Sequence, residues 1–417
     1  MATFEEKFQA AIDAQTLGGV VLQASDKTGK FTYAKAFGKH SLQEGSPASK
    51  KDVQLDSVFT LASCTKLLTS IAALQCVEQG LIGLDDDVSP VLTELKDAEI
   101  IDFPMESSTP KFTKAKSKIT LRMLLSHSSG FSYDLMSPDL AHWRQSRGEI
   151  PGPSGMPMMD RISMPLIFEP GTSWSYGAGL DWTGVLVARL SGGSLEAFMQ
   201  KHIWSPLEIK DITFHLHERP DMKARHVAMS AREGIANPTI SLGVFKKTGK
   251  AVFNDDKLYD DPIVDEYGGQ GLYGSPVEYM KVLESLTKND GKLLTAASVD
   301  EMFRPQLSAG GKAAVEGMMS VDMLQGTFGM APKGTSCDWG LGGLLILSDL
   351  ATGKRRGTMT WSGLPNLLWT IDRDAGLCCF YASQMVPFGD PQSHDYQQSF
   401  EKEMYDRLGN DSSGPHS

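Results

Sequence analysis

Val58-Phe-Thr-Leu-Ala-Ser-Cys-Thr-Lys-Leu-Leu-Thr-Ser-Ile-Ala-Ala-Leu74 is the stretch that decides the fold and the chemistry expected of this 417-residue chain. Its first four residues form an apolar run typical of a short strand, and the leucines after Lys66 recur with helical spacing up to a stop at Gly80. We therefore expect Ser63 at a helix N-terminus, with Lys66 three residues later on the same helix face. A hydroxyl next to an amine at the positive end of a helix dipole favours a reactive serine nucleophile.

The Ser-x-x-Lys spacing alone is weak evidence, because it occurs three more times, beginning at Ser108, Ser285 and Ser399. Ser108 precedes a Thr-Pro pair that is typical of a loop. The other two lie in amphipathic helical stretches, where a solvated serine and lysine are ordinary surface residues. Only Ser63 follows a strand and begins a helix, so its assignment depends on partners further along the chain.

Five further segments follow Ser63 in the order in which a known superfamily carries its own motifs. They are Ile119–Gly130, Glu169–Ala178, Ser205–Phe214, Gly268–Pro276 and Trp361–Gly363. On these segments the chain resembles the serine β-lactamase and penicillin-binding-protein superfamily, in particular class C β-lactamases and family VIII esterases. Six ordered segments over nearly the whole chain argue against a chance likeness.

Within that superfamily the nearest resemblance is to the fungal lovastatin-pathway acyltransferases, which are transesterases of the simvastatin-synthase type. The segments that carry this resemblance are Leu61–Cys76, Arg219–Met222 and Pro365–Cys378. It implies an α/β (α+β) fold of the class C β-lactamase type, in which helices flank an antiparallel sheet and a mainly helical domain is inserted. The implied domains are 1–80 together with 208–417, and 81–207, with the active site in the cleft between them.

Residue patterns favour the same layout. An N-terminal helix is expected with Phe4, Phe8 and Ile12 on one face. A last helix is expected from about residue 393 to 408, with a loose tail over 410–417. Short strands separated by turns predict an antiparallel meander near the C-terminus. The expected strands are Val20–Leu22, Phe31–Tyr33, Leu344–Leu347, Gly357–Trp361, Leu367–Ile371 and Leu377–Tyr381.

The composition limits the classes of partner. With 41% hydrophobic and 22% charged residues the chain is typical of a globular protein, and its formal charge of −11 disfavours nucleic acid and anionic membranes as partners. No apolar run reaches membrane-spanning length, and the acidic N-terminus does not resemble a secretory signal. Five cysteines without metal-ligand spacing indicate reduced thiols, so we expect a cytoplasmic protein without a metal or other cofactor.

Ser63 is the expected nucleophile, and an alcohol needs a neighbouring base to react. Lys66 can serve as that base only as a neutral amine, a form that burial favours. The resemblance implies a coupled Ser63–Lys66–Tyr176 unit, in which the group as a whole holds the proton. Backbone N–H groups of Ser63 and Leu364 are the candidates to stabilise the carbonyl oxygen in the transition state, the second by alignment of the motifs.

Two triplets depart from the β-lactamase pattern. Where β-lactamases have Tyr-x-Asn, this chain has Tyr176-Gly177-Ala178, and where they have Lys-Thr-Gly, it has Trp361-Ser362-Gly363. The lost amide and the lost cation favour an apolar ester over an anionic lactam as the substrate. We expect all three residues of the second triplet, together with Tyr133, to line the substrate pocket.

Two other features have structural explanations, and a third has two open interpretations. We interpret Cys64, beside the nucleophile, as a buried packing residue rather than a second nucleophile. The resemblance makes His127 structural as well. The Pro-, Gly- and Met-rich segment 137–164 fits either a surface excursion or a mobile apolar lid, and the sequence leaves both interpretations open.

Together these residues favour a serine acyltransferase that moves a short acyl group from an ester or thioester donor, through an acyl–Ser63 intermediate, to a polyketide-like alcohol. The donor is a free ester or an acyl carrier protein domain. If water replaces the alcohol, the same site is a carboxylesterase, because the choice depends on how the pocket positions the acceptor. A β-lactamase or peptidase is disfavoured by Ala178 and Trp361, and a non-enzymatic scaffold by the presence of all three reactive residues.

Overall fold

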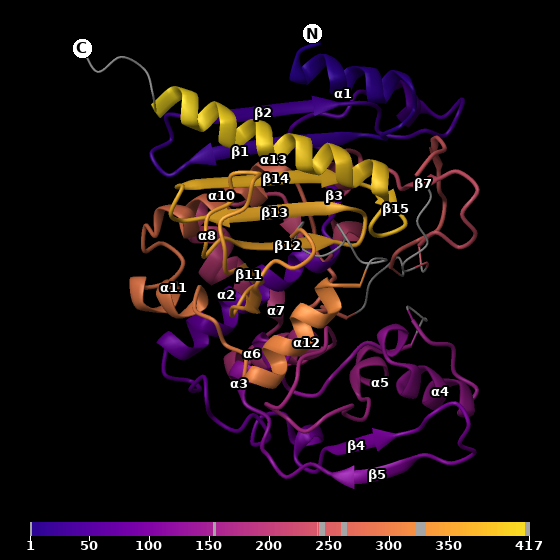
Figure 1. Ribbon diagram of the computed structural model, residues 1–417, viewed down its shortest axis with the longest axis vertical. Helices are drawn as coiled ribbons and strands as arrows, with labels where there is room; N and C mark the ends of the chain where they lie inside the picture. The colour runs from indigo at the N-terminus through magenta and orange to yellow at the C-terminus, as the bar shows by residue number, and fades with distance from the viewer. Residues whose placement is uncertain are drawn as a thin grey trace.

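A seven-stranded antiparallel sheet forms the centre of the molecule (Figure 1). The computed structural model describes residues 2–152, 156–239, 241, 247–259, 265–321 and 331–412. In spatial order the strands are β10 (Cys337–Trp339), β11 (Leu344–Ile346), β12 (Met359–Gly363), β13 (Leu367–Asp372), β14 (Leu377–Ser383), β1 (Val20–Asp26) and β2 (Thr32–Phe37). The first and last parts of the chain therefore build one sheet.

Both faces of this sheet are covered by helices, as β14 illustrates. Helices α1 (Phe4–Asp13) and α13 (Pro391–Ser412) cover one face, and α10 (Pro276–Lys288) covers the other (Figure 1). Successive side chains of a strand point to opposite faces. Cys379 and Tyr381 accordingly pack in the cluster with α1 and α13, whereas Phe380 stacks on Tyr279 of α10 with 4.6 Å between ring centroids. Burial on both faces explains why β14 is apolar almost throughout.

Three smaller sheets and a set of helices surround the central sheet. The sheets are β3 (Phe59–Thr60) with β9 (Tyr273–Gly274) and β6 (Ile212–Thr213), β15 (Met385–Val386) with β7 (Ser230–Arg232) and β8 (Ala251–Phe253), and the hairpin β4 (Glu99–Asp102) with β5 (Lys111–Lys114). The helices are α2 (Thr65–Glu78), α3 (Leu121–Leu125), α4 (Pro138–Ser146), α5 (Met158–Ile162), α6 (Gly179–Ser191), α7 (Leu195–Met199), a π-helical turn (Gln200–Trp204), α8 (Ser205–Leu207), α9 (Pro220–Lys223), α11 (Ala296–Met302) and α12 (Ala309–Met319).

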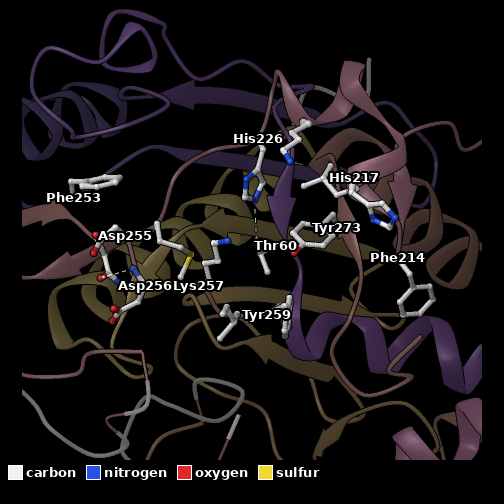
Figure 2. Close-up of a pocket in the computed structure, with 15 residues that line it drawn as sticks. Thr60, Phe214, His217, His226, Phe253, Asp255, Asp256, Lys257, Tyr259 and Tyr273 are labelled. Atoms are coloured by element: carbon white, nitrogen blue, oxygen red, sulfur yellow. Dashed lines mark hydrogen bonds between the residues drawn. The ribbon is translucent and has the colours of Figure 1, made fainter. Parts of the chain in front are cut away.

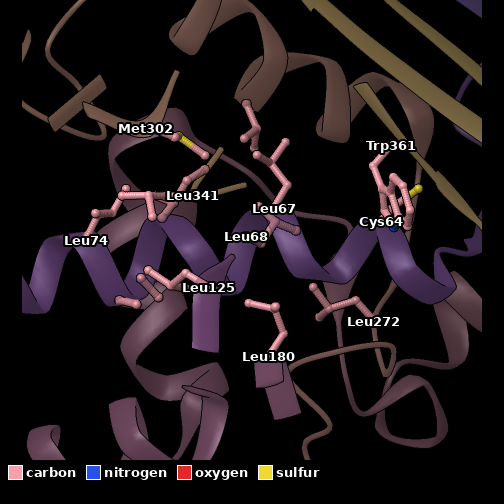
Figure 3. Packing of buried hydrophobic residues seen from close by; sticks show 14 of the residues in the cluster. Cys64, Leu67, Leu68, Leu74, Leu125, Leu180, Leu272, Met302, Leu341 and Trp361 are labelled. Carbon is pink, nitrogen blue, oxygen red and sulfur yellow. The ribbon is translucent and has the colours of Figure 1, made fainter. Parts of the chain in front are cut away.

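Helix α2 is buried on every side, because each residue from Thr65 to Cys76 is buried. Most of these residues are apolar, and a helix with apolar side chains on every face has to lie inside the protein. Figure 3 shows the leucines of α2 enclosed by side chains such as Leu125, Leu180 and Met302, which come from distant parts of the chain. The start of α2, where Ser63 and Lys66 lie, is therefore held from all directions.

Most of the predicted elements are confirmed, including the N-terminal hairpin, the four C-terminal strands and both terminal helices. The expected loose tail is wrong for residues 410–412, because α13 continues to Ser412; residues 413–417 lie outside the described part. Strands β4 and β5 were not expected, because they are short and every residue of β5 is exposed.

The two-domain division into 1–80 with 208–417, and 81–207, stays a proposal, because one hydrophobic cluster includes residues of both parts. In the segment 137–164 the structure has α4 and α5, and residues 153–155 lie outside the described part. Whether this segment acts as a lid stays a prediction. No described helix combines the length and apolar character needed to span a bilayer.

Candidate active site

Ser63 lies in a tight turn between a strand and a helix. Strand β3 ends at Thr60, a 3-10 turn covers Ala62–Cys64, and α2 begins at Thr65, so Ser63 is just before the helix rather than inside it. Ala62 has a φ of 47°, in the left-handed region that costs free energy for a residue with a side chain. Such strain is common where a turn presents a reactive group, and here it immediately precedes the predicted nucleophile.

Cys64, the next residue, holds this turn in place. It is fully buried, its backbone N–H donates to the Leu61 carbonyl at 3.0 Å, and its own carbonyl accepts from the Tyr279 hydroxyl at 2.9 Å. Burial raises the pKa of the Cys64 thiol, which is therefore neutral at physiological pH. These contacts fit the packing role expected for Cys64.

Lys66 lies beneath Ser63 and is only 2% exposed. Its Nζ donates to three acceptors, which are Ser63 Oγ at 3.2 Å, the Tyr133 hydroxyl at 3.2 Å and the Gly269 carbonyl at 2.6 Å. An ammonium group has three N–H donors, so these acceptors satisfy it completely. The structure thus places the Ser63 hydroxyl in direct contact with a buried amine.

A buried carboxylate lies on the far side of Tyr133. Asp181, on α6, is 1% exposed and accepts hydrogen bonds from the Tyr133 hydroxyl at 3.2 Å and from the Gly269 N–H at 2.9 Å. Burial raises the pKa of Asp181, while the charge of Lys66 and the Gly269 N–H act in the opposite direction. Burial and the charge of Asp181 raise the pKa of Tyr133 well above its usual value, so Tyr133 is a neutral phenol. Hydrogen bonds therefore run from Ser63 through Lys66 and Tyr133 to Asp181.

Tyr176 lies against the same amine. The Lys66 Nζ is 4.6 Å from the centroid of the Tyr176 ring, a distance within the range of a cation–π contact. The Tyr176 hydroxyl accepts a hydrogen bond from the Trp361 indole N–H at 3.1 Å. The structure thus brings Ser63, Lys66 and Tyr176 together, although 110 residues separate Lys66 from Tyr176 in the sequence.

Backbone contacts explain how Tyr176 reaches this position. The Tyr133 N–H donates to the Tyr176 carbonyl at 3.3 Å, which ties the segment to the stretch that follows α3. A Cβ atom on Gly177 would lie 2.5 Å from the Ser132 Cα, so only glycine permits this approach. His127 accepts from the Gly177 N–H at 3.3 Å through Nδ1. Burial, followed by the charge of Lys66, holds the pKa of His127 well below its usual value, and these contacts fit a structural role.

The end of β12 packs directly on the Ser63 turn. A Cβ atom on Gly363 would lie 2.5 Å from the Leu61 carbonyl oxygen and 3.3 Å from the Cys64 sulfur. Gly363 was expected to line the substrate pocket, and the close approach seen is to the backbone of the nucleophile turn. It brings Leu364 beside that turn, and the oxyanion role of the Ser63 and Leu364 N–H groups stays a prediction.

Trp361 and Ser362, expected in the substrate pocket, are both buried, at 2% and 5% exposure. Trp361 packs edge-to-face on Trp339 with 4.6 Å between centroids and contacts the Tyr176 ring at 5.0 Å. Its place is in the aromatic core beneath Tyr176. Tyr133 is half-buried, and its hydroxyl accepts a hydrogen bond from Lys66 and donates one to Asp181. Contact of these residues with a substrate stays a prediction.

Asp181 and Gly269 are the two contributors that sequence reasoning missed. Asp181 had a usable signal, because it is an acid within the otherwise apolar run Gly179-Leu-Asp-Trp-Thr-Gly-Val-Leu-Val187. A carboxylate in such a run must be paired when it is buried. The Gly269 carbonyl had no signal, because any residue could supply it from the backbone.

Two groups of side chains in the described residues have the spacing to share a metal ion: Glu196 with His215 and Glu266, and His215 with His217 and Glu218. Neither includes Ser63 or Lys66. The Glu196 carboxylate already accepts from the Thr213 hydroxyl and the Phe214 N–H, both at 2.7 Å. These contacts account for the first group as a structural network of ion pairs and hydrogen bonds.

Comparisons with known proteins agree with the fold. The sequence profile described as beta-lactamase matches residues 4–401. The chain belongs to the beta-lactamase family. Its relatives in this family of enzymes include a monacolin J acid methylbutanoyltransferase of Aspergillus terreus, which is 34% identical over 96% of this chain and 94% of that protein.

A lovastatin esterase of Penicillium rubens is 39% identical over 95% of this chain and 96% of that protein. Among solved structures, the LovD6 mutant of simvastatin synthase from Aspergillus terreus superposes with a TM-score of 0.88 and 36% identity, over 98% of this chain and 95% of that one. The beta-lactamase fold predicted from the sequence is confirmed. A transferase and an esterase match this chain over similar lengths.

Proposed function

We propose that this protein is a serine acyltransferase that moves a short acyl group from an ester or thioester to the hydroxyl of a polyketide-like alcohol. The contact that carries the proposal is the 3.2 Å hydrogen bond between Lys66 Nζ and Ser63 Oγ, with the Tyr176 ring 4.6 Å from the same nitrogen. The similarity to a methylbutanoyltransferase over nearly the full chain supports the type of substrate.

The proposed reaction has two steps. Ser63 Oγ attacks the carbonyl carbon of the donor while its proton passes to Lys66, as a neutral amine, or to Tyr176, and the donor's alcohol or thiol leaves with that proton. The acceptor hydroxyl then attacks the acyl–Ser63 ester, loses its proton to the same pair of groups, and releases Ser63 as the free alcohol. The N–H groups of Ser63 and Leu364 would stabilise the carbonyl oxygen in each step, by about 3 kcal/mol for each donor.

Tyr133 and Asp181 act in this proposal as positioning residues. They touch Lys66 or each other, and the negative charge of Asp181 balances the positive charge that Lys66 carries once it has taken a proton. A buried ammonium without such a partner would be costly. Their hydrogen bonds also hold the Lys66 amine at a fixed distance from Ser63.

A carboxylesterase is the second candidate, because water can replace the acceptor alcohol at the same acyl–Ser63 ester. The 39% identity to a lovastatin esterase favours it. An acyl carrier protein as the donor and a cytoplasmic location remain parts of the proposal. The five cysteines, all free thiols, support a reducing compartment.

The nucleophile can be tested with a fluorophosphonate probe followed by peptide mass spectrometry. We expect the added mass on Ser63, loss of labelling in Ser63→Ala, and normal labelling in Ser70→Ala, which removes a buried hydroxyl two helical turns further along α2. Unlabelled Ser63 in the folded wild type would favour a non-enzymatic scaffold.

Transfer can then be separated from hydrolysis by adding monacolin J acid to the enzyme and an activated methylbutanoyl thioester. We expect a new ester of the acceptor and a faster release of thiol than with water alone. Hydrolysis at the same rate with every alcohol tested would leave only the esterase.

A further inference from the structure

His127 is hydrogen-bonded to both neighbours of Tyr176 in the chain. Its backbone carbonyl accepts a bond from the Ser175 N–H at 3.1 Å, and its ring Nδ1 accepts one from the Gly177 N–H at 3.3 Å. The Tyr176 side chain leaves the backbone between these two bonds, and the centroid of its ring lies 4.6 Å from Lys66 Nζ. One histidine therefore holds the backbone on both sides of the tyrosine that meets the buried amine.

The contact with Gly177 requires one form of the His127 ring. A backbone N–H can only donate, so Nδ1 has to offer a lone pair, and the proton of the neutral imidazole lies on Nε2. Burial, followed by the charge of Lys66, holds the pKa of His127 well below its usual value, which keeps the ring neutral at physiological pH. His127 therefore offers an uncharged acceptor at this position.

A second histidine near the nucleophile turn makes a less restrictive contact. His226 Nε2 lies 3.0 Å from the hydroxyl of Thr60, the last residue of β3, as the dashed line in Figure 2 shows. A hydroxyl can rotate to donate or to accept, so this bond is compatible with either neutral tautomer of His226. Of these two contacts, only the one between His127 and Gly177 fixes the place of the ring proton.

The position of His127 costs stability in two ways. Its φ of 57° lies in the left-handed region, and its Nε2 is buried without a hydrogen-bond partner among the described residues. The ring is 1% exposed and packs against Trp174, Tyr176 and Trp339, with centroid distances of 6.2, 4.8 and 5.0 Å. Backbone strain and unsatisfied buried donors are concentrated at functional sites. Both features fit a residue that is kept for its contact with the Tyr176 segment.

We propose that His127 is a positioning residue for the reaction, and that its ring nitrogen holds the segment around Tyr176 so that the phenol stays against Lys66. The inference rests on the proposed function, in which Tyr176 shares the proton of Ser63, and it adds the group that places Tyr176 there. A role in packing alone would depend on the volume of the side chain. The proposed role depends on an acceptor at the place of Nδ1.

Asparagine and glutamine variants separate these two roles. His127→Asn keeps an acceptor as many bonds from the backbone as Nδ1 and tolerates the left-handed φ, but it leaves more of the ring's volume empty. His127→Gln fills more of that volume, but its amide lies one bond further out, at the distance of Nε2. For p-nitrophenyl acetate we expect kcat of His127→Asn within about fivefold of wild type and that of His127→Gln about 100-fold lower, because a misplaced reactive group costs rate steeply.

A double variant gives a readout that a purely structural role would not move. If His127 acts through Tyr176, His127→Gln should lower kcat by less than about threefold in Tyr176→Phe, because the group that it positions is already gone. Urea denaturation should show the same loss of stability in both backgrounds. His142→Asn on α4 is the matched control, since His142 Nδ1 lies 3.3 Å from the Phe103 carbonyl oxygen, and it should leave kcat unchanged.

Wild-type kcat in His127→Gln, or a larger loss in His127→Asn than in His127→Gln, would overturn the positioning role. A loss of about 100-fold by His127→Gln in the Tyr176→Phe background would overturn it as well, because the effect would not pass through Tyr176. A further measurement does not depend on the folding of variants. In the wild-type chain we expect the ¹⁵N shifts of His127 to show a neutral ring with its proton on Nε2, and a proton on Nδ1 would contradict the proposal.

The proposed function fails in a different experiment. Wild-type protein that is neither labelled on Ser63 by the fluorophosphonate probe nor active on esters would remove the proposed function and this inference together. An enzyme that is labelled on Ser63 and hydrolyses p-nitrophenyl acetate, yet has the same kcat in His127→Asn and His127→Gln, keeps the proposed function and loses only the role of His127.

Discussion

The indole N–H of Trp361 donates a hydrogen bond to the hydroxyl oxygen of Tyr176 at 3.1 Å. Trp361 occupies the position where β-lactamases have a lysine, and it is buried in the aromatic core beneath the site. A phenol oxygen that accepts this bond is fixed in place, with its ring against Lys66. Trp361, which stands where β-lactamases have a substrate-binding lysine, therefore orients Tyr176, one of the proposed reactive groups.

Trp361→Phe removes this hydrogen bond and part of the packing. We expect kcat for a p-nitrophenyl ester to fall about tenfold, because a misplaced reactive group costs rate steeply, and the free energy of unfolding to fall by about 1–3 kcal/mol. Trp339→Phe is the matched control, since Trp339 packs on Trp361 but its indole N–H has no partner among the described residues. A similar loss of kcat in both variants would assign the effect to packing.

Tyr133→Phe removes the hydroxyl that joins Lys66 to Asp181. We expect kcat to fall by about one to two orders of magnitude, with the fold intact, because Lys66 loses one acceptor and the link to its buried counter-charge. Asp181→Asn should change kcat in the same direction and alter the pH–rate profile, which a purely structural residue would leave in place. Kinetics of both single variants and the double variant provide the measurement.

If the two residues act as one unit, the losses in the double variant will be smaller than the product of the single losses. If the loss of kcat in the double variant equals the product of the two single losses, Tyr133 and Asp181 do not act as one hydrogen-bonded unit. Tyr396→Phe, on α13 at the opposite face of the sheet, controls for the loss of a tyrosine hydroxyl.

The glycine at the end of β12 offers a test of the nucleophile turn. In Gly363→Ala the new Cβ would meet the Leu61 carbonyl oxygen at 2.5 Å, so the strand or the turn has to move. We expect a loss of about 1–3 kcal/mol in the free energy of unfolding and a clear fall in kcat. Urea denaturation and ester hydrolysis measure the two effects.

Gly317→Ala is the opposite case and the control. Gly317 lies in α12 with open space around its Cβ position, so alanine should stabilise the protein by about 0.5–1 kcal/mol and leave kcat unchanged. A neutral Gly363→Ala would show that β12 does not press on the Ser63 turn.

Short-range sequence patterns predicted those parts of the site that lie within one continuous stretch of the chain. Strand, turn and helix around Ser63 follow from apolar spacing, and the contact between Ser63 and Lys66 follows from their separation of three residues. Tyr176 could not be placed by spacing, because its contact with Lys66 depends on how the segment near Ser132 packs against Gly177. Only the likeness to a known superfamily pointed to it.

The remaining contributors depend on tertiary packing. Asp181 reaches the site because α6 packs on α2, and the Gly269 carbonyl does so because close packing of the neighbouring Gly268 on Leu180 leaves no room for a side chain. Trp361 was expected to face the substrate, yet residues on both sides of β12 are buried, and its face of the strand points to the aromatic core. Sequence patterns showed that a strand such as β12 is buried, but they did not show toward which face the Trp361 side chain points.

The buried acid also predicts how stability depends on pH. Because burial raises the pKa of Asp181, the folded chain holds a proton that the unfolded chain, with an ordinary pKa of about 3.9, has already released. Unfolding then releases protons, so the contribution of Asp181 to the free energy of unfolding falls as the pH rises from about 4 through the raised pKa. Asparagine keeps the shape and does not titrate.

We therefore expect the stability of Asp181→Asn, relative to that of wild type, to increase as the pH rises above about 4, while the variant loses activity because Lys66 loses its buried counter-charge. Urea denaturation of both proteins at several pH values measures this difference. Curves that stay parallel over the whole range would mean that Asp181 titrates alike in the folded and unfolded chains, and that the hydrogen bonds from Gly269 and Tyr133 offset its burial completely.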